Sequence, residues 1–157
     1  MENVDKSVLV MWKEYLQQIG EDSNGTSLTY ESWHFCDNQK DANELVQLVL
    51  EGAKRATASL HRTYKFENEE VPKEGSHVVI TDWEGTAKCI IKNHKISILP
   101  FKDITEDHAR IEGEGDLSLE YWREGHIRFF TMECEVMGIE FSQDMLVVFE
   151  EFHLVYP

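Results

Sequence analysis

The segment Gly52-Ala53-Lys54-Arg55-Ala56-Thr57 carries two cationic side chains and a hydroxyl within a few residues. A partly buried lysine loses its proton more easily, because desolvation disfavours the charged form, and the neutral amine can then act as a base. A threonine hydroxyl is a group that such a base activates as a nucleophile. Lys and Arg at the end of a helix also commonly do no more than complement its dipole. Lys54 and Thr57 therefore have a chemical and a purely structural interpretation.

A second candidate segment is the glycine-interrupted acidic run that contains Glu112, Glu114 and Asp116. Three nearby carboxylates can bind Mg²⁺ or Ca²⁺, but this run lacks the ligand spacing of an EF-hand loop. Gly113 and Gly115 allow sharp turns on both sides of Glu114, so that one carboxylate can point inward while the others stay in water. We predict no metal site and no cofactor, and the inward carboxylate can be any of the three.

The histidines and cysteines give no further ligand pattern. Seven histidines are scattered, and no two have the HxxxH spacing that places two ligands on one helix face. Cys36, Cys89 and Cys134 lack CxxC spacing, so we interpret them as buried free thiols. The histidines are interpreted as surface or core residues.

Two predicted elements position the first candidate segment. Apolar residues at helical spacing predict a helix over 42–50, which Gly52 ends just before Lys54. The following residues 56–61 alternate small apolar and polar side chains, as in a strand with one buried face. Lys54 and Thr57 should therefore lie at a junction between a helix and a strand.

The rest of the chain predicts an α+β protein. An amphipathic helix is expected over 8–19, a β-hairpin over 77–82 and 86–99, a short helix over 104–112, a helix over 118–137 and a last strand over 145–156. This order lacks regular βαβ alternation, which favours a barrel-like sheet over a doubly wound one. We expect one domain over 1–157, with the helix and linker of 1–30 packed on it.

The composition limits the partners. Thirty Asp and Glu against 15 Lys and Arg give a net charge of −15, which repels long nucleic acid unless the cations Lys54, Arg55, Arg62, Arg123 and Arg128 cluster. A small nucleoside or a single RNA base remains compatible with this charge, because salt screens exposed charges within about 8–10 Å. The sequence contains neither a signal-like start nor a membrane-length apolar run, so we expect a cytoplasmic protein without membrane association.

Three segments together resemble the ASCH family. They are Trp33-His34-Phe35-Cys36-Asp37, the stretch from Ala42 through Leu60 with its GxKxxT pattern, and the acidic loop from Glu112 followed by Tyr121-Trp122-Arg123. The resemblance implies a PUA-like, curved or closed β-barrel with flanking helices. Family members have been associated with RNA binding, with ribonuclease activity and with amide hydrolysis on N4-acylated cytidine.

The resemblance to the small amidohydrolase branch implies a catalytic triad. In that branch the motif lysine and threonine work with a glutamate that follows a Thr-Glu-x-His-Ala stretch, and here Thr105-Glu106-Asp107-His108-Ala109 leads to Glu112. Lys54 would then be the base, Thr57 the nucleophile and Glu112 the group that positions or protonates. The expected substrate-binding residues are Trp33, Asp37, Arg55, Ser59, Trp122 and Arg123.

The expected function is that of a metal-independent amidohydrolase acting on N-acylated, cytidine-like compounds. Ser59 stands where the amidohydrolase branch carries a basic residue, so the side chains that contact the substrate are expected to differ from those of that branch. Two alternatives stay open: a non-catalytic module that binds RNA or a modified base, and a ribonuclease.

Overall fold

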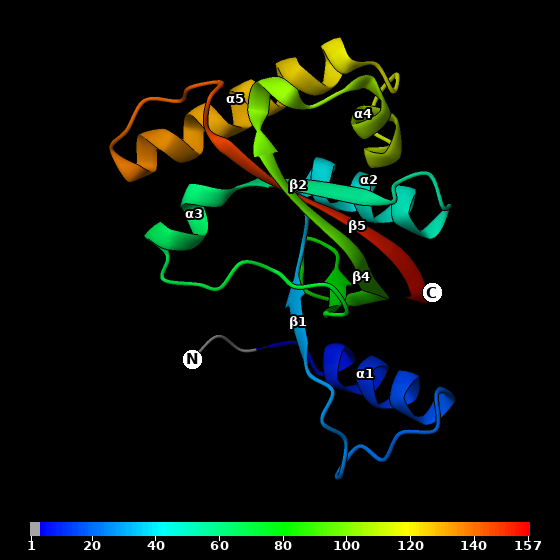
Figure 1. Ribbon diagram of the computed structural model, residues 1–157. Helices are drawn as coiled ribbons and strands as arrows, with labels where there is room; N and C mark the ends of the chain where they lie inside the picture. Colours follow the sequence, from blue (N-terminus) through cyan, green and yellow to red (C-terminus); the bar gives the residue numbers. More distant parts are fainter. Residues whose placement is uncertain (1–3) are drawn as a thin grey trace. The chain divides into compact units, whose positions relative to one another are not determined.

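The computed structural model describes residues 4–157 of the chain. In chain order its elements are α1 (Lys6–Gln18), β1 (Tyr30–Trp33), α2 (Gln39–Leu50), β2 (Ala56–Leu60), α3 (His61–Phe66), β3 (His77–Thr81), β4 (Ala87–Pro100), the 3₁₀ turn η1 (Phe101–Asp103), α4 (Glu106–Glu112), α5 (Leu119–Met137) and β5 (Leu146–Tyr156). Figure 1 traces them along the chain. Helices and strands mix without regular βαβ alternation, which confirms the predicted α+β class.

The five strands form a mixed sheet in the order β1-β3-β4-β5-β2. Strands β3 and β4 form the predicted antiparallel hairpin, with Val79 opposite Ile90. Strand β1 is parallel to β3, and β2 is antiparallel to β5. Because β1 and β2 are the two edges, the sheet is open, and of the two forms expected, curved or closed, the closed barrel is wrong.

The chain divides into two compact units, and β4 and β5 contribute to both. The first unit comprises residues 4–52, 75–93 and 153–157, and the second comprises 53–74 and 94–152. The single domain expected over 1–157 stays a prediction.

Helix α1 buries its apolar face inside the first unit. The residues of this core lie at helical spacing on α1 and on the inward side of the hairpin: Val8, Trp12, Tyr15, Leu16, Val79 and Ile90. The side chain of Asp5 caps the helix by accepting a hydrogen bond from the backbone N–H of Ser7. The prediction of an N-terminal helix is confirmed.

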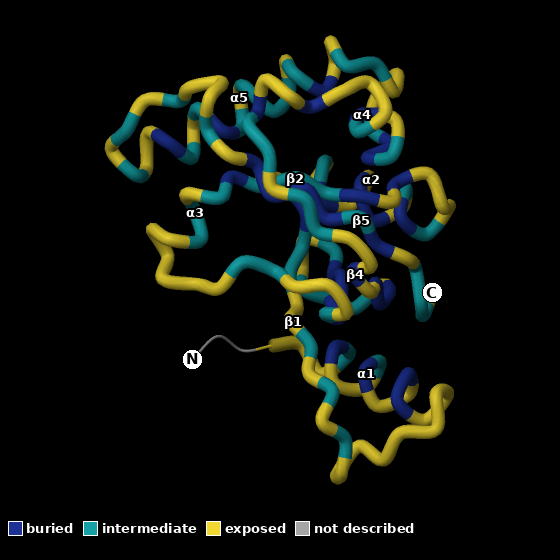
Figure 2. The backbone as a smooth tube through the Cα atoms, in the orientation of Figure 1, coloured by how far each residue is buried: buried dark blue, intermediate teal, exposed yellow. Residues whose placement is uncertain are grey.

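The second unit has its own core, built from β2, β5, α4 and α5. Its buried residues include Leu60, Ala109, Trp122, Phe130 and Phe149. Helix α5 starts at the N-cap Ser118 and ends at Gly138, whose φ of +72° is the left-handed conformation in which many helices stop. Figure 2 shows buried residues along β5 and more exposed ones along the outer turns of α5. This unit carries the candidate site.

Apart from the short turn η1, one helix and one strand were not predicted from the sequence. Helix α3 has no buried residue, so it lacks the apolar stripe that reveals an amphipathic helix. Strand β1 has four residues, of which the central two are exposed. The predicted helix over 104–112 starts only at Glu106, because Thr105 is its N-cap.

No helix within residues 4–157 combines the length and the apolar character needed to cross a membrane.

Candidate active site

Backbone contacts hold the end of α4 against the residues that precede β2. The N–H of Arg55 donates to the carbonyl oxygen of Ile111 at 2.9 Å. Gly113 follows α4 with a φ of +76°, and a Cβ at this position would overlap the carbonyl oxygen of Ala53. Only glycine fits both the left-handed conformation and the close approach. The close approach at Gly113 therefore places Glu112 next to Lys54.

Lys54 is buried, with 2% of its surface exposed. Its Nζ donates to the carbonyl oxygen of Ala56 at 2.8 Å, to Oε2 of Glu114 at 3.2 Å and more weakly to the carbonyl oxygen of Glu112 at 3.5 Å. Oε1 of Glu112 lies 3.8 Å from the same nitrogen. All of these contacts are to oxygen acceptors, to which the Lys54 nitrogen can donate. Lys54 thus has the burial that a chemical role requires.

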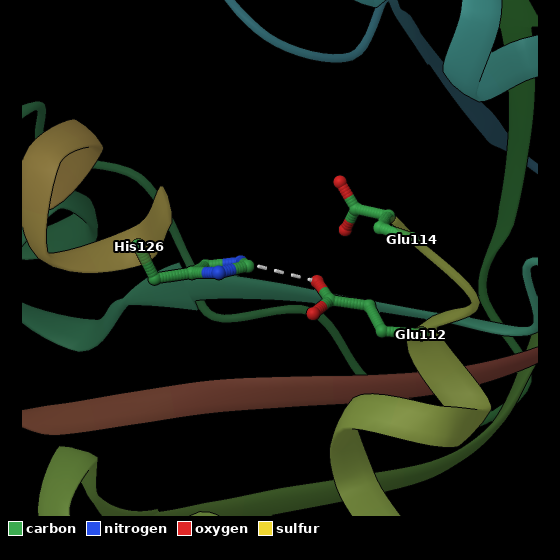
Figure 3. Close-up of side chains that lie close together, drawn as sticks. All are labelled: Glu112, Glu114 and His126. Carbon is green, nitrogen blue, oxygen red and sulfur yellow. Dashed lines mark ion pairs between the residues drawn. The ribbon is translucent and has the colours of Figure 1, made fainter. Parts of the chain in front are cut away.

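Glu112 is the more buried of the two carboxylates, with a side-chain exposure of 2%. Figure 3 shows its ion pair with His126. The indole N–H of Trp122 donates to Oε2, and Nε2 of His126 lies 3.4 Å from Oε1. Burial by itself would raise the pKa of Glu112, but the charges of His126 and Lys54 and the hydrogen bonds from His126 and Trp122 lower it to about 2. Glu112 is therefore a fixed anion at neutral pH.

The surroundings of His126 favour a proton on each ring nitrogen. Its Nδ1 lies 2.8 Å from the carbonyl oxygen of Trp122, which can only accept, so Nδ1 must donate. Its Nε2 faces the carboxylate of Glu112, which favours a second N–H. Burial would lower the pKa of His126, but the negative charges of Glu112 and Glu114 and these hydrogen bonds raise it.

Glu114 lies two residues beyond Glu112 in the loop after α4 and has 21% of its side chain exposed. Burial raises the pKa of Glu114, the Lys54 charge offsets this only in part, and the negative charge of Glu112 raises it further. Two carboxylates close together in sequence thus differ in their pKa: Glu112 holds its charge, and Glu114 accepts a proton more readily.

Helix α5 supplies the wall of the site. Trp122 and His126 are four residues apart and share one helix face, and their rings stack with centroids 4.0 Å apart and planes at 14°. The loop that leads into α5 contains Gly115, where a Cβ would overlap the ring of Tyr121. Both glycines of the acidic run are therefore needed for the local packing.

Glu112, Glu114 and His126 form the one group of potential metal ligands within residues 4–157. Ligand atoms of Glu112, Glu114 and His126 lie within 4.8 Å of one another (Figure 3). The Lys54 ammonium lies against both carboxylates, however, and His126 is itself cationic, so positive charge already balances the cluster. The absence of a metal site stays a prediction.

Thr57 and Ser59 lie on the same face of β2. Ala56, Ala58 and Leu60 pack into the core of the second unit, and because side chains alternate along a strand, Thr57 and Ser59 face the other side. The Lys54 ammonium contacts the carbonyl of the peptide group that joins Ala56 to Thr57. The hydroxyl of Ser59 is hydrogen-bonded to that of Tyr64 at 2.7 Å.

The other predicted substrate-binding residues have different surroundings. Trp122 is buried and bonded to Glu112, Arg123 donates to Oε1 of Gln143 at 2.9 Å, and Arg55 is exposed. Trp33 and Asp37 belong to the first unit, where Trp33 contacts Phe35 edge to face. The structure therefore brings together Lys54, Glu112 and Trp122.

A pocket of about 550 Å³ lies elsewhere in the second unit. It is lined by residues of α3, including Arg62 and Lys65, and by residues of 137–146. None of the predicted site residues lines it.

The sequence pattern gives no role to His126 and does not indicate which carboxylate points inward. The spacing of Trp122 and His126 is the signal that places this histidine on the same helix face as a large core aromatic. For Glu114 the signal is its position between two glycines. That Lys54 meets both carboxylates is a long-range contact, which no local pattern contains.

The comparisons with known proteins agree with this geometry. Residues 31–156 match the ASCH domain model. The chain belongs to the ASCH family. An ASCH domain from Lactobacillus crispatus JV V101 is 35% identical, with a TM-score of 0.92 and coverage of 100% of this chain and 99% of that one. A protein from Enterococcus faecalis V583 is 36% identical, with a TM-score of 0.87 and coverage of 96% and 89%.

A further solved structure, of a hypothetical protein, is 18% identical with a TM-score of 0.52, covers 80% of this chain and 99% of that one, and supports the fold alone. No curated protein matches the chain. Membership of the ASCH family confirms the resemblance based on the GxKxxT pattern and the acidic loop, and it gives the open α+β sheet its PUA-like assignment.

Proposed function

We propose that this ASCH domain is an amidohydrolase that removes the acyl group from nucleoside-sized, N-acylated cytidine-like compounds. Thr57 is the nucleophile, Lys54 handles its proton, and Glu112 holds Lys54 in position. The observation that carries the proposal is the burial of Lys54, whose ammonium contacts the peptide group preceding Thr57 and two carboxylates. A buried lysine that contacts the peptide group before a strand threonine supplies the two residue types, base and hydroxyl, that an activated nucleophile needs.

The charge of the chain supports a small substrate. With a net charge of −15, extended RNA is repelled, whereas a neutral nucleoside is not. Lys54 belongs to the basic group that would have to cluster for RNA binding, but it is buried among carboxylates and does not reach a phosphate. A ribonuclease is therefore the less favoured enzyme. A cytoplasmic location agrees with such a substrate and remains part of the proposal.

The second candidate is a non-catalytic module that binds a nucleoside or an RNA base. One observation favours it: the contacts of Lys54 stabilise the ammonium form, and an ammonium ion has no free electron pair with which to accept a proton. A binding site needs only a fixed charge and a shaped wall, whereas an amidohydrolase needs a step that frees the Lys54 amine.

Incubation with a panel of N-acylated nucleosides and short RNAs, followed by mass analysis of the products, distinguishes these functions. The proposal expects free nucleoside and free acid, with intact RNA. Thr57→Val should abolish release, and Thr29→Val, at an exposed position just before β1, is the matched control. Binding of a nucleoside without any product would instead support the binding module.

A further inference from the structure

The two glutamates of the site have different numbers of partners. Both oxygens of Glu112 face donors, Trp122 at Oε2 and His126 with Lys54 at Oε1. Within residues 4–157, the one side chain that bonds to Glu114 is Lys54, through Oε2 at 3.2 Å. Glu114 therefore has a free oxygen, and Glu112 has none.

The two glutamates also differ in access. With 2% of its side chain exposed, Glu112 is closed off from a bound substrate, whereas Glu114 has 21% exposed. A general acid must come within about 2.6–3.2 Å of the atom that it protonates, or reach it through one water. Glu114 is open to the solvent from which a substrate enters, and its Oε2 contacts the Lys54 amine whose proton must be removed.

We propose that Glu114, and not Glu112, is the carboxyl that exchanges protons with Lys54 and with the leaving group, while Glu112 is a fixed anion that positions Lys54. This inference rests on the amidohydrolase function proposed above, and it assigns the catalytic carboxyl to a residue that the family resemblance did not select. It also supplies the step that frees the Lys54 amine.

The proton steps balance. First, a proton moves from Nζ of Lys54 to Oε2 of Glu114, which leaves a neutral amine and a neutral acid. Oγ of Thr57 then attacks the acyl carbon and gives its proton to Lys54. The carbon–nitrogen bond breaks, and the departing nitrogen takes the proton of Glu114. The products of this half-reaction are an acyl ester on Thr57, the free amine, an ammonium ion and a carboxylate.

The second half-reaction restores the site. Water attacks the ester carbon and gives a proton to Glu114, and the released oxygen of Thr57 takes a proton from Lys54. The proton on Glu114 then returns to Lys54, which regenerates the ammonium–carboxylate pair. The sum is amide plus water giving acid plus amine, and no other reactant is needed.

The charges around Glu114 fit this role. Three charged groups face Glu114: Lys54 from the segment that precedes β2, Glu112 from the end of α4, and His126 from α5. Burial and the charge of Glu112 raise its pKa, which narrows the gap in acidity between Glu114 and the Lys54 ammonium. Glu112 has a lowered pKa and stays ionised throughout.

The test combines a titration with an activity assay on the full chain. The side-chain carboxyl carbons of ¹³C-labelled glutamates are followed by NMR against pH, with Glu112→Gln and Glu114→Gln used to assign the signals. We expect the Glu114 midpoint to lie above that of an ordinary glutamate and to rise further in Lys54→Met, because the stabilising positive charge is lost. A midpoint at or below the ordinary value would overturn the inference.

In the activity arm, Glu114→Gln should fold like the parent and hydrolyse the acylated nucleoside about 10²–10⁴-fold more slowly, the range of general acid–base catalysis. Glu120→Gln, at an exposed position early in α5, is the matched control and should keep the parent rate. Folded Glu114→Gln with the parent rate would overturn the inference. If the parent hydrolyses nothing, the proposed function fails, and the NMR midpoint alone decides whether Glu114 exchanges protons.

Discussion

Trp122 donates its indole N–H to Glu112, ten residues earlier in the chain. The same indole stacks on the imidazole of His126. One buried side chain on α5 thus orients both the carboxylate that holds Lys54 and the histidine that keeps this carboxylate ionised.

Replacing Trp122 by Phe should therefore destabilise the chain. The variant keeps an aromatic ring but leaves an acceptor of Glu112 without its donor, which costs about 1–3 kcal/mol when the acceptor is buried. Denaturant unfolding measures this loss. Trp83→Phe, at a position with 39% exposure, is the control and should change the free energy of unfolding far less. Equal effects of both variants would contradict a structural role for the indole N–H.

Gly113 and Gly125 give a matched pair of substitutions. At Gly113 an added Cβ meets the backbone of Ala53 and Lys54, and its φ is +76°, so Gly113→Ala should lower the melting temperature. Gly125 lies inside α5 with open space around it, so Gly125→Ala should stabilise the helix by about 0.5–1 kcal/mol. Thermal unfolding of both variants tests this opposite sign.

The raised pKa of His126 makes the stability depend on pH. At pH values below the ordinary value of 6.5, the imidazole is protonated in both folded and unfolded chains, and its attraction to Glu112 stabilises the fold fully. As the pH rises through the higher pKa of the folded state, this contribution is lost. The difference in unfolding free energy between the parent and His126→Gln should therefore shrink as the pH rises from below 6.5 through the raised pKa of the folded state.

For the control, Gln18→Ala changes an exposed residue without a titrating group at the end of α1. Its difference from the parent should stay nearly constant over the same pH range. A His126→Gln difference that grows with pH would contradict the doubly protonated imidazole.

Lys54→Ala should cost stability as well as activity. From the sequence, we expected this variant to leave the fold intact, but Lys54 is buried between two carboxylates. Removing one partner of a buried ion pair leaves an uncompensated charge and costs about 3–5 kcal/mol. Denaturant unfolding of Lys54→Ala and of the double variant Lys54→Ala/Glu114→Gln measures this, and the second substitution should restore part of the loss.

The fold followed largely from local patterns. The sequence predicted the hairpin of β3 and β4, the last strand β5 and the helices α1, α2 and α5. Each of these elements has strong periodicity or clear caps. Helix α3 and strand β1 were missed because neither has a buried stripe along its length. The sheet is open because its edge strands β1 and β2 do not pair with each other. Such pairing is a long-range property that local patterns do not contain.

The candidate site was predictable only in part. Lys54 and Glu112 were named from their motifs, and the structure brings them together. Glu114 and His126 were not selected, because their roles depend on long-range contacts. Glu114 contacts Lys54, 60 residues earlier in the chain, and His126 on α5 contacts Glu112 at the end of α4. The acceptors around the Lys54 amine could not be predicted for the same reason, since they come from a distant part of the chain.

The central claim is that Thr57 carries the acyl group during hydrolysis. Intact-protein mass analysis after brief mixing with an N-acylated nucleoside should detect one added acyl group, located on Thr57 by peptide mapping. Thr57→Val should remain folded, acquire no added mass and release no nucleoside. An acyl group on another residue, or parent-like release by folded Thr57→Val, would contradict the account.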